Sequence, residues 1–217
     1  MSRRLASFRS VPFRFSRLAL ALVALVAATA STPGFARSES GQWIAPPSNL
    51  PRAQRGERTH NLDFLFEALR IAPDQTSAKA IEDRIWAIWL TSGSDTCGLL
   101  MSRAKAAIDA EKLDLALKLL DAVLELKPAY AEAWNRRAMV FYMKKEYGRA
   151  VSDLGQVLAR EPRHFAALAG LGTILQEIGD DKHALEAYRR ALAVDPRLEG
   201  MDEKVKSLGA KIDGRDI

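Results

Sequence analysis

The sequence predicts an all-α protein, built as a solenoid of antiparallel helix pairs. Residues 97 to 196 contain three copies of a 34-residue pattern, and each copy ends on a proline at the same phase, namely Pro128, Pro162 and Pro196. A period of this length is typical of a unit that consists of one helix, a turn and a second helix. The chain is 48% hydrophobic and has no alternating Val, Ile and Thr runs, which would favour a sheet.

Six columns of apolar or small residues agree across the three copies. Their spacing within a copy is 4, 3, 9, 4 and 3 residues, so two helical faces are separated by a break. Each proline ends a unit, because the residue before a proline is pushed out of the helical region. The columns are Leu100, Trp134 and Leu168; Ala104, Ala138 and Gly172; Ala107, Phe141 and Leu175; Ala116, Ala150 and Ala184; Leu120, Leu154 and Tyr188; Val123, Val157 and Ala191.

The pattern resembles the tetratricopeptide repeat (TPR). The third copy has Leu171-Gly172 at the Leu-Gly place and Gly179-Asp180 at the turn, whereas the first copy departs, with Arg103 at the usual Leu place. The resemblance covers roughly half the chain and implies three repeats, at residues 97–130, 131–164 and 165–198. The second copy carries it most fully, with Trp134, Ala138, Phe141, Ala150, Leu154 and Pro162 at the family's positions.

Both ends of the repeat array are expected to be covered, because a solenoid needs distinct terminal units. Residues 61–96 predict a helical hairpin, interpreted as a degenerate repeat that caps the first unit, with Asp74 as an N-cap. Residues 199–217 predict a C-terminal capping helix. Its apolar positions recur at 4, 3 and 4 residues: Met201, Val205, Leu208 and Ile212.

The first 36 residues have the pattern of a signal peptide. Five arginines and no acidic residue are followed by an apolar run from Leu18 to Ala30, which is too short to span a bilayer comfortably. We expect export to the periplasm, with cleavage after Ala36 or after Ala30. An uncleaved anchor, which would be the chain's one contact with a membrane, and an organellar transit peptide are the alternatives.

Residues 37–60 contain Pro46, Pro47 and Pro51 and predict an extended linker. Trp43-Ile44 is its one apolar spot, and it either docks onto the domain, binds a partner or is exposed.

The charge of the whole chain is a targeting feature. Removal of the five leader arginines brings the formal net charge from +5 to about zero, so we expect no nucleic-acid binding. The single Cys97 excludes an internal disulfide. It is interpreted as a buried small residue, with a free thiol or an intermolecular bridge as alternatives.

No motif for catalysis, metal binding or cofactor binding is found. The three histidines, His60, His164 and His183, lack the spacing of a metal site or a catalytic triad, and no glycine-rich phosphate loop is present. We expect His164 and His183 to be solvated. The chain is therefore predicted not to be an enzyme, and no cofactor is expected.

The TPR resemblance implies that the first helix of each unit faces a concave groove. Methionines there adapt to varied apolar partners, and a tyrosine adds a hydrogen-bonding tip, although the methionines are as well explained as gap fillers between helices. At the places where some family members clamp a terminal carboxylate, Asn135 is the one fitting residue. The candidate partner-binding residues are Met101, Lys105, Asn135, Met139, Tyr142, Met143, Thr173 and Gln176.

The sequence thus predicts a non-catalytic adaptor of the bacterial envelope that binds a peptide or helix of a protein partner in this groove. One alternative is self-association, in which the groove or Trp43 binds another copy of the chain. The other is an envelope hydrolase or glycan-processing factor with an unrecognised site around Asp180 and His183.

Overall fold

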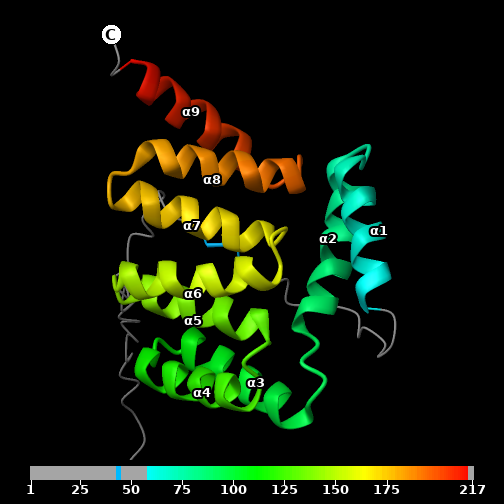
Figure 1. The fold of residues 1–217 in the computed structure, drawn as a ribbon, viewed down its shortest axis with the longest axis vertical. Helices are drawn as coiled ribbons and strands as arrows, with labels where there is room; N and C mark the ends of the chain where they lie inside the picture. The colour runs from blue at the N-terminus through cyan, green and yellow to red at the C-terminus, as the bar shows by residue number, and fades with distance from the viewer. Residues whose placement is uncertain (1–42, 45–57, 215–217) are drawn as a thin grey trace, which may run out of the picture. The chain divides into compact units, whose positions relative to one another are not determined.

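The computed structural model describes residues 43–44 and 58–214, and the elements found in this part of the chain are helices (Figure 1). The predicted leader with its two alternative cleavage sites, nearly all of the predicted linker, the His60 side chain and the last three residues lie outside the described residues. The helices are α1 Arg58–Arg70, α2 Gln75–Leu90, α3 Asp95–Asp109, α4 Leu113–Leu126, α5 Ala131–Met143, α6 Tyr147–Arg160, α7 Phe165–Glu177, α8 Asp181–Val194 and α9 Met201–Asp213.

Helices α3 to α8 form three stacked antiparallel pairs, so the predicted all-α solenoid of antiparallel helix pairs is confirmed (Figure 1). The small columns allow the close approach of the two helices in each pair. Ala138 on α5 and Ala150 on α6 are fully buried in the second pair. In the third pair, a Cβ on Gly172 would lie 2.5 Å from a ring carbon of Tyr188. Gly172 therefore makes room for a tyrosine where the other copies have leucine.

The turn inside each pair has the same backbone geometry. Glu111, Lys145 and Gly179 lie one repeat apart and have positive φ angles of 56°, 59° and 85°. The next amide in each turn donates to a carbonyl five residues back, as in Glu146 N–H to Phe141 O at 2.9 Å. This left-handed turn satisfies helix-end carbonyls and reverses the chain.

Substitution of Ala150 by leucine tests the close packing of α5 and α6. Because Ala150 is fully buried, we expect Ala150→Leu to lower the free energy of unfolding by about 1–3 kcal/mol through overpacking. Urea unfolding followed by circular dichroism measures the change. Leucine at the exposed Ser152 of the same helix is the control and is expected to change it by less than about 0.5 kcal/mol. Equal stability of the two variants would contradict this packing.

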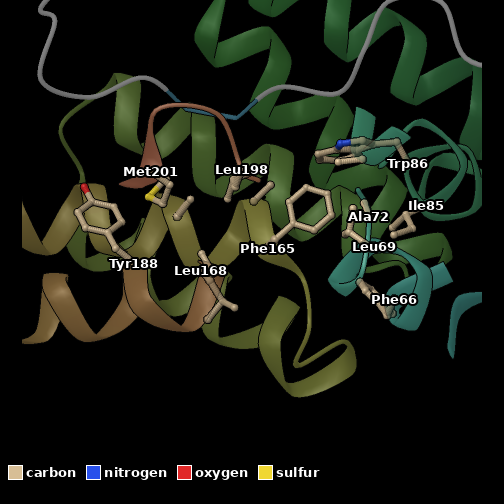
Figure 2. Close-up of a cluster of buried hydrophobic side chains, with 14 of the residues drawn as sticks. Phe66, Leu69, Ala72, Ile85, Trp86, Phe165, Leu168, Tyr188, Leu198 and Met201 are labelled. Atoms are coloured by element: carbon tan, nitrogen blue, oxygen red, sulfur yellow. The ribbon is translucent and has the colours of Figure 1, made fainter. Parts of the chain in front are cut away.

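The α1–α2 hairpin forms as predicted but does not stack on the first repeat. Instead, it shares a hydrophobic cluster with α7, α8 and α9, in which Trp86 of α2 faces Phe165 of α7 (Figure 2). The expectation that it caps the open end of α3 is therefore wrong. The physical reason lies in its large side chains: Phe66, Leu69, Ile85 and Trp86 are all nearly completely buried in that cluster.

Polar contacts fix the hairpin against the third repeat. Arg197, in the α8–α9 connection, donates to the carbonyls of Ala72 and Pro73 at 2.8 and 2.5 Å, and Gln75 donates to the Arg197 carbonyl at 2.9 Å. Arg163 pairs with Asp63 at 2.7 Å. The hairpin turn and α1 are thus each tied to an inter-repeat turn.

The C-terminal helix α9 packs on α8, as a capping helix should. Its Met201 and Leu208 are buried in the same cluster as Tyr188, while its polar positions are largely exposed. At the start of the repeats, Cys97 is a buried free thiol. Among the described helices, none combines the length and apolar character that crossing a membrane requires.

Candidate partner-binding face

The first helices of the three repeats, α3, α5 and α7, carry the candidate residues, and burial divides these residues into two groups. Met101, Asn135 and Thr173 are buried in the packing of the domain. Met139, Tyr142 and Gln176 are half-buried, and Lys105 and Met143 are exposed. The accessible candidates on α5 and α7 thus lie toward the C-terminal ends of these helices. We call Met139, Tyr142, Met143 and Gln176, together with the buried Gly170 in the middle of α7, the open face.

Hydrogen bonds and burial determine the polar character of the open face. The Tyr188 hydroxyl donates to Gln176 Oε1 at 3.0 Å and also lies 3.3 Å from Thr173 Oγ1, which orients the Gln176 carboxamide. Burial and the nearby Glu177 carboxylate raise the pKa of Tyr142 to about 12. Tyr142 therefore offers a neutral hydroxyl at physiological pH, together with an aromatic ring.

Trp43 packs on the open face. Its indole lies 5.8 Å from the Tyr142 ring, centroid to centroid. A Cβ on Gly170 would come within 2.8 Å of Trp43 Cη2 and 3.0 Å of Cζ3, so the indole edge rests on the bare backbone of α7. The adjacent Ile44 packs against the cluster shared by the hairpin and the third repeat. The sequence indicated docking as one possibility for Trp43, but not this partnership with Gly170.

A buried polar cluster closes the other end of these helices. Glu132 and Asn135 of α5 and His164, the N-cap of α7, are almost completely buried, and the imidazole of His164 stacks on Trp89 with ring centroids 3.9 Å apart. The expectation that His164 is solvated is therefore wrong. The residues next to His164 in the sequence do not indicate its burial, because the helix that covers it, α2, belongs to a distant part of the chain.

Within this cluster the hydrogen bonds orient the side chains. His164 Nδ1 accepts the Ala167 N–H at 3.2 Å, and its Nε2 lies 3.7 Å from Glu132 Oε2. Burial raises the pKa of Glu132, but His164, Arg136 and Asn135 outweigh it and hold the pKa below its usual value. Asn135, the one residue that fitted a carboxylate clamp, donates to Glu132 at 3.0 Å and so serves the interior.

Two buried carboxyl groups meet where the hairpin joins the end of α8. Glu82 of α2 is bound by Lys79 at 3.1 Å, and Asp195 accepts the Arg197 N–H at 3.0 Å. Burial, together with the neighbouring Glu82 carboxylate, raises the pKa of Asp195 to about 7. Near neutral pH the protonated form of Asp195 is thus more populated in the folded than in the unfolded chain.

This raised pKa predicts a pH dependence of stability. The pKa of Asp195 is higher in the folded than in the unfolded chain, so its contribution is complete below about pH 4 and is lost as the pH rises through about 7. We expect the unfolding free energy of the wild type, minus that of Asp195→Asn, to fall between pH 4 and pH 8. Urea titrations across this range measure the difference. A difference that stays constant or rises with pH would contradict the assignment.

Asp180 and His183, the pair considered as a possible catalytic site, form a helix cap. Asp180 is the N-cap of α8, and its carboxylate lies 2.8 Å from His183 Nδ1 and accepts the His183 N–H. Both side chains are well exposed to solvent. Elsewhere in the described part of the chain, no three His, Cys, Asp or Glu side chains gather in a way that could hold a metal ion.

Stacked antiparallel helix pairs with a 34-residue period define a helical-repeat solenoid. A family model for the tetratricopeptide repeat matches residues 101–156 and 146–198. A TPR repeat-containing protein of Rhizobium etli is 40% identical over 153 residues, which cover 70% of this chain and 75% of that protein. The chain therefore belongs to the tetratricopeptide repeat family, whose fold is that of protein–protein interaction adaptors.

Further comparisons agree on the fold. The general transcriptional corepressor ssn6 of Schizosaccharomyces pombe is 25% identical over 81% of this chain, which spans 16% of that protein. The first TPR of Spaghetti (RPAP3), bound to the HSP90 peptide SRMEEVD, has a TM-score of 0.53, with 17% identity over 55% of this chain and 95% of that one. A MamA RS-1 ArsTM double mutant has a TM-score of 0.50, with 20% identity over 74% and 88% of the two chains.

Proposed function

We propose that the protein is a non-catalytic adaptor of the bacterial cell envelope that binds a peptide segment or helix of a protein partner on the open face. The observation that carries this proposal is the position of Trp43. A side chain from outside the helices, remote in sequence, rests between Tyr142 and Gly170. The face therefore has the shape and apolar character to accept a side chain that comes from outside the helical repeats.

The chemistry of the open face favours an apolar ligand over an acidic tail. Asn135 and Ala166, at two places of the carboxylate clamp, are buried, and Gly170 and Met101 occupy two others without a charge. Lys105 occupies the fifth place, but its ammonium group pairs with Asp109 at 2.6 Å. The RPAP3 domain in the comparison binds an acidic HSP90 peptide. A segment with an aromatic or large aliphatic residue fits the present chain better, because Met139, Met143 and Tyr142 offer adaptable apolar contact.

The cellular compartment of the proposal rests on the leader. Residues 1–36 have the basic and apolar regions of a signal peptide, and the remaining chain is close to neutral. In this proposal, the repeats meet their partner after export, with the leader removed.

Photo-crosslinking in the native host tests the adaptor function. A photoreactive amino acid at Met143, which is 42% exposed on α5, is expected to yield a discrete adduct with another protein, which mass spectrometry identifies. The matched control has the same amino acid at Gln156, exposed on the second helix α6, and is expected to give no such adduct. Identical adducts from both positions, or none from Met143, would reject the open face as the binding surface.

The same preparation tests export. Cell fractionation is expected to place the protein in the periplasm, and the N-terminal peptide is expected to begin after Ala36 or Ala30. An intact N-terminus in the cytoplasmic fraction would exclude the envelope part of the proposal while leaving the adaptor function standing.

A further inference from the structure

We propose that Trp43-Ile44 is an internal ligand of the open face, which an outside partner has to displace. This inference rests on the proposed function and specifies the ligand, namely an extended segment with an aromatic residue followed by an aliphatic one. Trp43-Ile44 is thus an example, within the chain itself, of the type of segment that the open face recognises.

The fit between Trp43 and α7 is the first support. Trp43 approaches Gly170 so closely that any side chain there would overlap it, with Cζ2 at 3.2 Å and Cη2 at 2.8 Å from an added Cβ. Gly170 lies in the middle of α7, where glycine is less favourable than alanine because it loses more backbone freedom on folding. The close approach of the indole gives a physical reason for this glycine, and Tyr142 completes the contact on the side of α5.

The partial burial of the two residues is the second support. Trp43 and Ile44 each retain intermediate exposure, whereas the core residues beneath them are buried. Trp43 packs against the hydrophobic cluster of α5 to α7, and Ile44 packs against the cluster of the hairpin and the third repeat. Both residues lie at the edge of their cluster rather than at its centre. Their removal therefore leaves the helices packed, as a displaceable ligand requires.

Trp43 competes with an outside partner for the open face as a ligand that is covalently joined to the repeats. Residues 45 to 57 join Ile44 to α1, and a tether of this length reaches at most roughly 45 Å. Because this connection is covalent, the binding of Trp43 to the face is intramolecular and does not depend on the protein concentration. A partner in solution binds only those molecules in which Trp43 has left the face. Its apparent affinity is therefore its intrinsic affinity multiplied by the fraction of molecules with a vacant face.

Fluorescence anisotropy with the chain's own segment tests the inference. The probe is a fluorescein-labelled peptide of residues 38–50, SESGQWIAPPSNL, added to the full-length chain. We expect it to bind the Trp43→Ala protein at least tenfold more tightly than the wild type, because the substitution vacates the face. The same peptide with alanine in place of tryptophan is expected not to bind.

A second substitution locates the peptide on α7. In the Trp43→Ala background, Gly170→Ala is expected to abolish peptide binding, because the new Cβ occupies the place of the indole edge. The matched control is Gly148→Ala on α6, where an added Cβ meets nothing within 4 Å, and it is expected to leave binding unchanged. Circular dichroism of both variants verifies that the helices are retained.

Three outcomes would overturn the inference. These are equal affinity of the peptide for wild type and Trp43→Ala, no binding to either, or a wild-type dimer in light scattering that Trp43→Ala converts to a monomer, which would assign the indole to a second copy. Crosslinking from Met143 to a different protein would still support the proposed function in each of these cases. The experiments can thus reject the internal-ligand proposal without rejecting the proposed adaptor function.

Discussion

Replacement of Trp86 by alanine is expected to lower the free energy of unfolding by about 3–5 kcal/mol. Trp86 is completely buried and packs edge-on against Phe165, Trp89 and His164, with ring centroids 5.8, 5.2 and 5.7 Å away. It thereby joins the hairpin to the third repeat (Figure 2). Because no residue nearby can fill the space of an indole, Trp86→Ala leaves a cavity at this junction.

Urea unfolding monitored by circular dichroism measures this loss, and hydrogen exchange locates it. Helices α1 and α2 are expected to exchange faster than α5 and α6, since solenoid units gain stability from their neighbours. Phe64→Ala on α1 is the control, because the Phe64 side chain is 69% exposed and its loss is expected to cost less than about 0.5 kcal/mol. A loss below about 1 kcal/mol for Trp86→Ala would mean that the hairpin is not held by this contact.

The second large effect is expected for Glu132→Ala, with a loss of about 3–5 kcal/mol, because it removes one partner of a buried ion pair. Glu132 is completely buried and accepts from Arg136 and from Asn135, each at 3.0 Å. Its removal leaves the Arg136 guanidinium, which is 11% exposed, without this carboxylate. It also removes the carboxylate beside His164.

Two further variants separate charge from shape at this position. Glu132→Gln keeps an oxygen acceptor of similar size and is expected to cost less than Glu132→Ala, while Glu125→Ala at an exposed position of α4 is expected to be nearly neutral. Chemical denaturation at pH 7 compares the three. If Glu132→Ala were as stable as Glu125→Ala, the buried cluster would contribute nothing to the fold.

The repeats could be predicted from the sequence because each depends on contacts within about 34 residues. Ala138 and Ala150 recur in fixed columns, and the turns at Glu111, Lys145 and Gly179 repeat at the same spacing. Local helical periodicity and the proline after each pair therefore predict three helix pairs, which α3 to α8 form in the structure. The C-terminal helix follows from the same periodicity.

The accessibility of the candidate residues could be predicted only in part. The sequence named Tyr142 and Gln176, which retain accessible surface in the structure. It did not reveal that Asn135 is buried, because α2, which covers its polar cluster, is distant in sequence. Nor did it reveal that Thr173 is buried, although Tyr188, which binds it, lies in the same repeat.

What the sequence by itself determined is therefore the class of protein: an all-α repeat array, its units and its family. The tertiary structure alone decided where the hairpin docks, that His164 is buried under Trp89, and that Trp43 rests on Gly170. The physical reason is the range of the interactions. Helix periodicity and turns are encoded by neighbouring residues, whereas the fit of an indole against a glycine or an imidazole depends on complementary shapes that no local pattern records.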